Sequence, residues 1–169
     1  MSVLIELWPL AADETAIWLI SGADPWVSWQ IPADNEPHFT AEQLASGQED
    51  GIQFDLLHST SWRVDGSGHV LLTYVGIVTT TEEYVRTRWP NALPVTAELS
   101  QTVGRPLTHA AAEPPTPRDI DVLMHAIRHL RFLADTDESA RSAMSPAWLR
   151  HLQTLRPALS GLYTDRHVS

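Results

Sequence analysis

The 169-residue chain contains neither cysteine nor lysine, and these two absences remove several kinds of chemistry. Without cysteine there are no disulfide bonds, thiolate metal ligands or cysteine nucleophiles. Without lysine, Schiff-base formation and catalysis by a lysine nucleophile are excluded. The chain also lacks an apolar run near the roughly 20 residues of a membrane-spanning helix. Its N-terminus, MSVLIELWPL, has no basic region of the kind that begins a signal peptide, so we expect a cytoplasmic protein with no membrane partner.

Basic residues are scarce. Eleven arginines stand against 21 acidic residues, which gives a formal net charge of −10. Because an acidic surface repels phosphate backbones, we predict no nucleic-acid partner. The hydrophobic fraction of 43% is typical of a globular protein. A chain of this length is most simply one domain, with a mainly β part at 1–90, a proline-rich connection at 91–117 and a helix pair at 118–160.

The strongest structural signal is the stretch 56–78, LLHSTSWRVDGSGHVLLTYVGIV. Residues typical of strands flank the turn signal Asp-Gly-Ser-Gly at 65–68, which predicts a β-hairpin. The second strand of this hairpin is apolar at successive positions, so both of its faces are expected to be covered. We therefore predict that the hairpin lies at the centre of a larger sheet.

The turn also predicts how the two strands pair. If Val64 lies opposite His69, then alternation along the strand places His58, Thr60 and Trp62 on one face. Arg63 then lies on the other face of the sheet.

The rest of the chain supplies further elements. Turn residues separate three short apolar segments, which predicts strands at 3–10, 16–21 and 26–31 with an antiparallel arrangement. Capping patterns predict helices near 41–46 and 82–88, a helix that begins after Thr116-Pro117, and another after Ser145-Pro146. A short strand is expected at 95–99. The predicted fold class is α+β, with a mixed or antiparallel sheet around the central hairpin (56–78) and a C-terminal antiparallel helix pair.

One candidate for chemistry is the pair His125 and His129 in the first C-terminal helix. Their spacing of i and i+4 suits a metal ion, as in His-Glu-x-x-His zinc sites. The segment here is HAIRH, so the general-base glutamate is missing. The interpretation we favour is a solvated polar face on which Asp121 interacts with His125.

A second candidate is the set of tryptophans in the β half, which are Trp8, Trp18, Trp26, Trp29 and Trp62. Tryptophans can form an aromatic core, or stack against a ligand. The interpretation we favour for most of them is an aromatic core, and for a ligand pocket the predicted lining is Trp29, Trp62, His58 and Arg63. A Ser-His-acid triad around His58 is not favoured, because there is no Gly-x-Ser-x-Gly turn and adjacent strand residues point to opposite faces.

Two segments resemble the Nudix hydrolase family. Trp29-Gln30-Ile31-Pro32 resembles the family's W-x-x-P segment, and 88–94, RWPNALP, resembles its late R-W…L-P stretch. In the best register of the Nudix box, Glu36, Glu49 and the pair Gly51-Ile52 match. Leu44 stands where the family has its pairing arginine.

The resemblance covers residues 1–100 and implies a Nudix-like fold. It further implies a magnesium-dependent hydrolase of nucleoside diphosphate derivatives, with Glu36 and Glu49 as the metal-binding carboxylates. Only Glu49 remains of the acidic cluster, however. We therefore predict a non-catalytic small-ligand-binding or protein-interaction domain without a cofactor, and keep the diverged hydrolase as the alternative. A homodimer would form through the helix of Trp148 or an exposed sheet edge.

Overall fold

The computed structural model describes residues 2–29, 31, 35–48, 51–95 and 119–158. The strands are β1 (Val3–Ala12), β2 (Ile17–Leu19), β3 (Trp26–Val27), β4 (Leu56–Val64), β5 (Val70–Thr79) and β6 (Leu93–Val95). The helices are α1 (Pro37–Ser46), α2 (Glu82–Arg88), α4 (Asp119–Thr136), α5 (Glu138–Ser142) and α6 (Pro146–Gln153). The fold class is α+β, as predicted.

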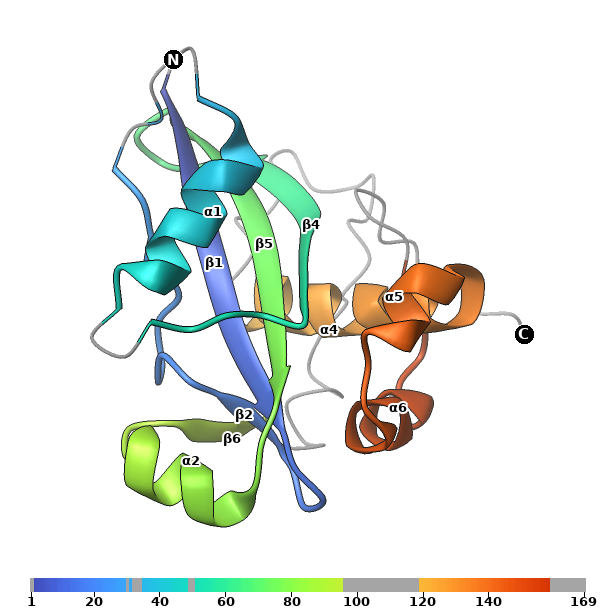
Figure 1. The fold of residues 1–169 in the computed structure, drawn as a ribbon. Coiled ribbons are helices and arrows are strands. Elements are labelled where there is room, and N and C mark those ends of the chain that lie inside the picture. The colour runs from blue at the N-terminus through green and yellow to red at the C-terminus, as the bar shows by residue number, and fades with distance from the viewer. Residues whose placement is uncertain (1, 30, 32–34, 49–50, 96–118, 159–169) are drawn as a thin grey trace.

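The six strands form one mixed sheet in the order β4-β5-β1-β2-β6, and β3 also pairs with β1. The predicted hairpin is β4 and β5, which pair antiparallel. β5 then runs parallel to β1 along the whole of both strands, from Val3 opposite Val70 to Ala12 opposite Thr79. β5 therefore lies inside the sheet between β4 and β1 (Figure 1), which explains why it is apolar on both faces.

The turn end of the hairpin is shifted by one residue from the predicted register. Val64 pairs with Val70 and not with His69. At the far end, His58 pairs with Val75, the partner that extending the predicted register gives it. The register changes in the middle of β4, where a β-bulge leaves Thr60 as an extra residue, fully buried.

The bulge moves the β4 side chains that follow Thr60 to the opposite face from the one that the predicted register gives them, while His58 keeps its predicted partner. Arg63 reaches α4 through Asp119, 4.0 Å away, and His58 contacts the same helix through His129. Trp62 pairs with Leu72, which packs in the cluster under α1. The prediction that His58 shares a face with Trp62 and opposes Arg63 was therefore wrong, whereas Trp62 and Arg63 do lie on opposite faces. A slip of one residue moves every later side chain to the other face.

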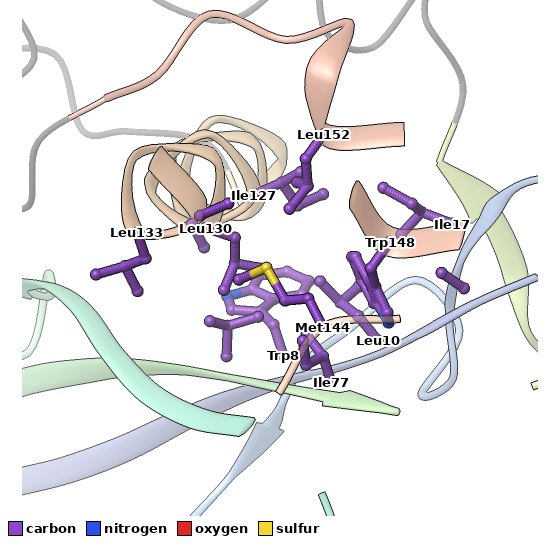
Figure 2. Packing of buried hydrophobic residues seen from close by; sticks show 14 of the residues in the cluster. Trp8, Leu10, Ile17, Ile77, Ile127, Leu130, Leu133, Met144, Trp148 and Leu152 are labelled. Carbon is purple, nitrogen blue, oxygen red and sulfur yellow. The ribbon is translucent and has the colours of Figure 1, made fainter. Parts of the chain in front are cut away.

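Helices cover both faces of the sheet (Figure 1). α4 packs on one face with α5 and α6 against it, and Figure 2 shows the cluster that they bury with the sheet. Its fully buried members include Trp8, Leu10, Ile77, Ile127, Leu130, Trp148 and Leu152. α1 covers the other face through Ala41 and Ala45, which pack with Ile5, Leu7 and Tyr74.

Two helices begin where the capping patterns predict. Ser145 accepts a hydrogen bond from the backbone N–H of Trp148 at 3.3 Å and caps α6. Thr81 accepts one from the N–H of Tyr84 at 3.2 Å and caps α2. Both contacts satisfy a helix N–H group that has no intrahelical partner. The expected capping residues of the first C-terminal helix, Thr116-Pro117, lie outside the described residues.

Two predictions about helices need correction. α1 begins at Pro37 and not near residue 41, so Thr40 lies within the helix and does not cap it. Proline at the first helical position has the backbone angle of a helix and needs no N–H partner, and this outweighs the capping pattern at Thr40. Between α4 and α6, the two helices of the predicted C-terminal pair, the chain forms a further short helix, α5, capped by Asp137.

Candidate functional site

The structure does not bring the two predicted ligand-binding tryptophans together. Trp29 follows β3 and is 93% exposed, whereas Trp62 on β4 is 65% exposed. β3 pairs with one edge of β1, while β5 and then β4 lie beyond its other edge. Trp8 is in the core. Trp18 and Trp26 are partly buried, so the tryptophans of the β half are spread over core, intermediate and surface positions.

Arg63 lies in a buried polar cluster that joins three strands. Its Nη1 donates to Glu6 Oε2 at 2.7 Å and its Nη2 donates to Glu6 Oε1 at 2.6 Å. The hydroxyl of Thr73 donates to Glu6 Oε2 at 3.0 Å, and the indole N–H of Trp8 approaches the same oxygen at 3.4 Å. Glu6 is only 3% exposed. Its hydrogen bond to Arg63 raises the pKa of the guanidinium, which therefore stays protonated.

The guanidinium of Arg63 donates hydrogen bonds to Glu6 and Thr73 in this cluster, so few of the N–H groups of Arg63 remain for a ligand. Glu6 and Thr73 are neighbours in the pairing of β1 with β5, and the bulge in β4 directs Arg63 to the same face. The sequence analysis did not single out Glu6. The sequence feature that could have identified Glu6 is its position as the lone acidic residue in the apolar strand VLIELWPL. Burying such a charge costs free energy unless the charge is paired.

His58 and His129 meet between β4 and α4. Their Nε2 atoms are 3.4 Å apart, and Nδ1 of His129 lies 3.0 Å from the carbonyl oxygen of Ala158. A carbonyl oxygen can only accept, so Nδ1 of His129 carries the proton and its Nε2 has a free lone pair. His58 therefore donates through its own Nε2–H. Phe132 stacks against the other side of His129, with ring centroids 5.8 Å apart.

Both imidazoles are held neutral at neutral pH. Burial lowers the pKa of His58, and the neighbouring His129 lowers it further. Burial also lowers the pKa of His129, against the opposing effect of its hydrogen bond to Ala158. The pair therefore lacks the mutual repulsion of two imidazolium ions.

The sequence analysis predicted that His129 lies on a solvated polar face, and this prediction was wrong. His129 is 4% exposed, because α4 is enclosed on the side where this residue meets β4. His125, one turn earlier, is half-buried, and burial lowers its pKa, with a further lowering from His129. Within the described ranges, no three His, Asp or Glu side chains are grouped as they would be around a metal ion.

Of the two carboxylates named by the family resemblance, the structure describes only one. Glu36 precedes α1 as its N-terminal flanking residue and is exposed. Glu49 lies outside the described residues. The geometry of an acidic site at these positions therefore stays a prediction.

A hollow of ≈ 270 Å³ lies beside α2. Its walls come from two segments, 51–55 before β4 and 78–89 at the end of β5 and in α2. Tyr84 and Trp89 form an aromatic wall, edge to face with ring centroids 5.2 Å apart. Asp55, Gln53 and Arg88 add polar groups to the lining. The sequence analysis had noted Arg88 and Trp89 for their resemblance to the R-W segment, but had not placed them in a pocket.

No protein-family model matches this chain, and no curated protein matches it significantly. Among the helices of the described residues, none is both long enough and apolar enough to cross a membrane.

Proposed function

We propose that this protein is a non-catalytic binding domain of Nudix-like architecture that holds a small planar ligand in the hollow beside α2, in the cytoplasm. One observation carries the proposal. Gly51 and Ile52 match the end of the Nudix box, Arg88 and Trp89 match the later R-W segment, and all four line the same hollow. Segments that are distant in the sequence but share one family resemblance would be expected to meet at a ligand site.

The lining indicates the chemistry of the ligand. Trp89 and Tyr84 offer ring faces and edges on which a planar ring can pack. Asp55 and Gln53 supply hydrogen-bonding groups, and Arg88 supplies a positive charge. The volume of ≈ 270 Å³ is just below the roughly 300–1,000 Å³ of pockets for drug-sized ligands. A single heterocycle with a short polar or anionic substituent, such as a nucleoside or a mononucleotide, fits these features.

The proposal is tested by titrating adenosine, AMP and ADP into ¹⁵N-labelled protein and following backbone amide shifts. We expect shifts in segments 51–55 and 78–89 with at least one probe, and we expect Trp89→Ala to remove them. Arg86→Ala is the matched control, because Arg86 lies in α2, three residues before Trp89, and pairs with Glu82 outside the hollow. An unchanged response in Trp89→Ala, or no response to any probe, would refute the assignment.

The alternative is a diverged magnesium-dependent hydrolase of nucleoside diphosphate derivatives. It is supported by the same observation, that residues matching the Nudix box and residues matching the R-W segment line one hollow. Glu36 is also exposed to solvent, next to the start of α1. Glu36 and Glu49 would bind the metal. Cleavage of ADP-ribose to AMP and ribose 5-phosphate in the presence of Mg²⁺, lost in Glu49→Gln, would favour the hydrolase over the binding domain.

We also propose that two copies associate through the edge strand β4. Trp148 is 1% exposed, so its helix cannot offer that side chain to a partner. On β4, Trp62 and Val64 are 65% and 52% exposed. The strand has no acidic residue, and its one arginine is paired with Glu6, so this surface is locally neutral on a chain with a net charge of −10. Two like-charged copies can approach most easily at such a neutral apolar edge.

Sedimentation velocity across a range of protein concentrations tests this association. We expect a monomer–dimer equilibrium that Trp62→Ser shifts to monomer. Trp29→Ser is the control, because Trp29 is more exposed but lies beyond the opposite edge of β1. A wild-type protein that is monomeric at every concentration, or a dimer that Trp62→Ser leaves intact, would contradict the proposal.

A further inference from the structure

The contact between His58 and His129 has the geometry of two metal ligands. Tetrahedral zinc sites have metal–nitrogen distances of about 2.0–2.1 Å, which places two ligand nitrogens about 3.3–3.4 Å apart. The Nε2 atoms of His58 and His129 are 3.4 Å apart, and their ring centroids are 5.4 Å apart. The two rings therefore approach each other through these nitrogens. An ion about 2.0–2.1 Å from each nitrogen would lie slightly off the line that joins them.

The surroundings of His129 also fit this role. A metal-binding histidine usually donates its second ring N–H to a carbonyl or carboxylate, which fixes the tautomer and the direction of the lone pair. His129 donates Nδ1–H to the carbonyl of Ala158 at 3.0 Å and keeps the lone pair of Nε2 for His58. Phe132 packs against its ring and holds its orientation. One ligand is thus already directed toward the second before any ion is bound.

We propose that His58 and His129 form a two-histidine site for a divalent transition-metal ion of the zinc, nickel and copper class. The ion occupies the place of the proton that the two Nε2 atoms share. His58 changes tautomer, so that the proton leaves Nε2 and is carried on Nδ1, and both neutral rings then bind through Nε2. Water completes the coordination, because His58 is only partly buried and open to solvent.

The chemistry of the donors selects the metal. Imidazole nitrogen suits Zn²⁺, Ni²⁺ and Cu²⁺, whereas Mg²⁺ prefers oxygen ligands. Both imidazoles are neutral near pH 7, as metal binding requires, since burial lowers the pKa of each ring. Asp137, which acts electrostatically on His58, and the net charge of −10 favour a cation at this position. The site differs from a pair on one helix turn, because the partner of His129 is on β4 and is not His125.

The site is tested by titrating Zn²⁺, Ni²⁺ and Mg²⁺ into the chelator-treated full chain by calorimetry. We expect one Zn²⁺ or Ni²⁺ to bind per chain and Mg²⁺ to give no heat. His58→Gln should weaken Zn²⁺ binding by at least about 10- to 100-fold, because losing only a group that hydrogen-bonds to a metal ligand already costs that much. His125→Gln is the matched control, one helical turn from His129, and should bind as the wild type does.

A second readout keeps the test independent of folding. In ¹⁵N-detected spectra of histidine-labelled protein, Zn²⁺ should shift the Nε2 signals of His58 and His129 and leave that of His69 unchanged. Circular dichroism shows whether His58→Gln is folded, and His58→Asn replaces it if it is not. The proposal fails if Zn²⁺ and Ni²⁺ do not bind, if His125→Gln and not His58→Gln removes binding, or if the Nε2 signals of this pair do not move.

Discussion

The carboxylate of Glu6 in β1 accepts hydrogen bonds from both terminal nitrogens of Arg63 in β4, a residue 57 positions later in the chain. β5 lies between these strands and adds the hydroxyl of Thr73 to the same carboxylate. The pair can form only with the bulge in β4, because the predicted register directs Arg63 to the other face. This contact therefore links the register of the hairpin to the position of β1.

Removing either charge of this pair should be strongly destabilising. We expect Glu6→Gln or Arg63→Met to lower the free energy of unfolding by about 3–5 kcal/mol, because the remaining charge is left buried without a partner. Combining both substitutions should recover part of that loss. Urea unfolding of the four proteins forms the double-mutant cycle. As a control, Arg86→Ala removes an exposed ion pair with Glu82 and should cost under about 1 kcal/mol. Additive losses would show that the pair does not act as a unit.

Gly76 is expected to resist substitution because of its neighbour Phe54. A Cβ at position 76 would lie 2.6 Å from three atoms of the phenyl ring, which packs directly over the backbone of β5. Gly76→Ala should lower the midpoint of urea unfolding, with a loss of about 1–3 kcal/mol from overpacking. Gly66→Ala is the matched control, since a Cβ at that position would meet no neighbouring atom within 4 Å. If both alanine variants unfold alike, the ring of Phe54 can move away without cost.

Asp13 should make the stability depend on pH in the acidic range. Its buried side chain accepts hydrogen bonds from Thr15, Ala16 and the indole of Trp18 at 2.7–2.9 Å. Burial alone raises the pKa of Asp13, but these hydrogen bonds outweigh it and lower the pKa below the ordinary 3.8. The stabilisation is therefore complete above the unfolded pKa and is lost as the pH falls through the folded one.

We accordingly expect Asp13→Asn to cost about 1.5–3 kcal/mol at pH 7, the worth of a hydrogen bond to a charged group. The difference from the wild type should shrink below the ordinary carboxyl pKa. Guanidinium unfolding at several pH values measures it, with substitution of the exposed Asp24 by Asn as the control. A cost that is equal at all pH values would show that the charge of Asp13 is not what stabilises the turn.

Trp148 ties α6 to the end of β5. Its indole N–H donates to the carbonyl oxygen of Val78 at 2.8 Å, and the side chain is 1% exposed. Trp148→Phe leaves that carbonyl without its donor and should lower the thermal midpoint, at a cost of about 1–3 kcal/mol. Trp29→Phe, at a position 93% exposed, should change the stability by no more than about 0.5 kcal/mol. Amide exchange in α6 that stays as slow as in the wild type would contradict this role of the hydrogen bond.

Much of the fold was predictable because its signals are local. The Asp-Gly-Ser-Gly turn sets the hairpin, and Gly68 has the positive φ of 80° that such a turn needs. The apolar run of β5 predicted its interior position, and the caps at Thr81 and Ser145 marked two helix starts. Each of these features depends on residues within a few positions of one another.

The polar contacts were not predictable in the same way. The sequence analysis named His58, Arg63 and His129 as candidates, but it gave His58 and Arg63 the wrong relative faces and paired His129 with His125. One extra residue at Thr60 changed the faces, and a bulge leaves no clear pattern in the sequence LLHSTSWRV. The hollow beside α2 was missed because its two walls lie in segments that are not adjacent along the chain.

The sequence by itself determined the α+β class, the hairpin and its apolar inner strand, because turn chemistry and hydrophobic periodicity act over a few residues. Only the tertiary structure decided which charges and rings meet. The parallel pairing of β1 with β5 and the packing of α4 on β4 bring together Glu6 with Arg63 and His58 with His129. Those pairings depend on how buried surfaces fit over separations of 57 and 71 residues, which no local pattern encodes.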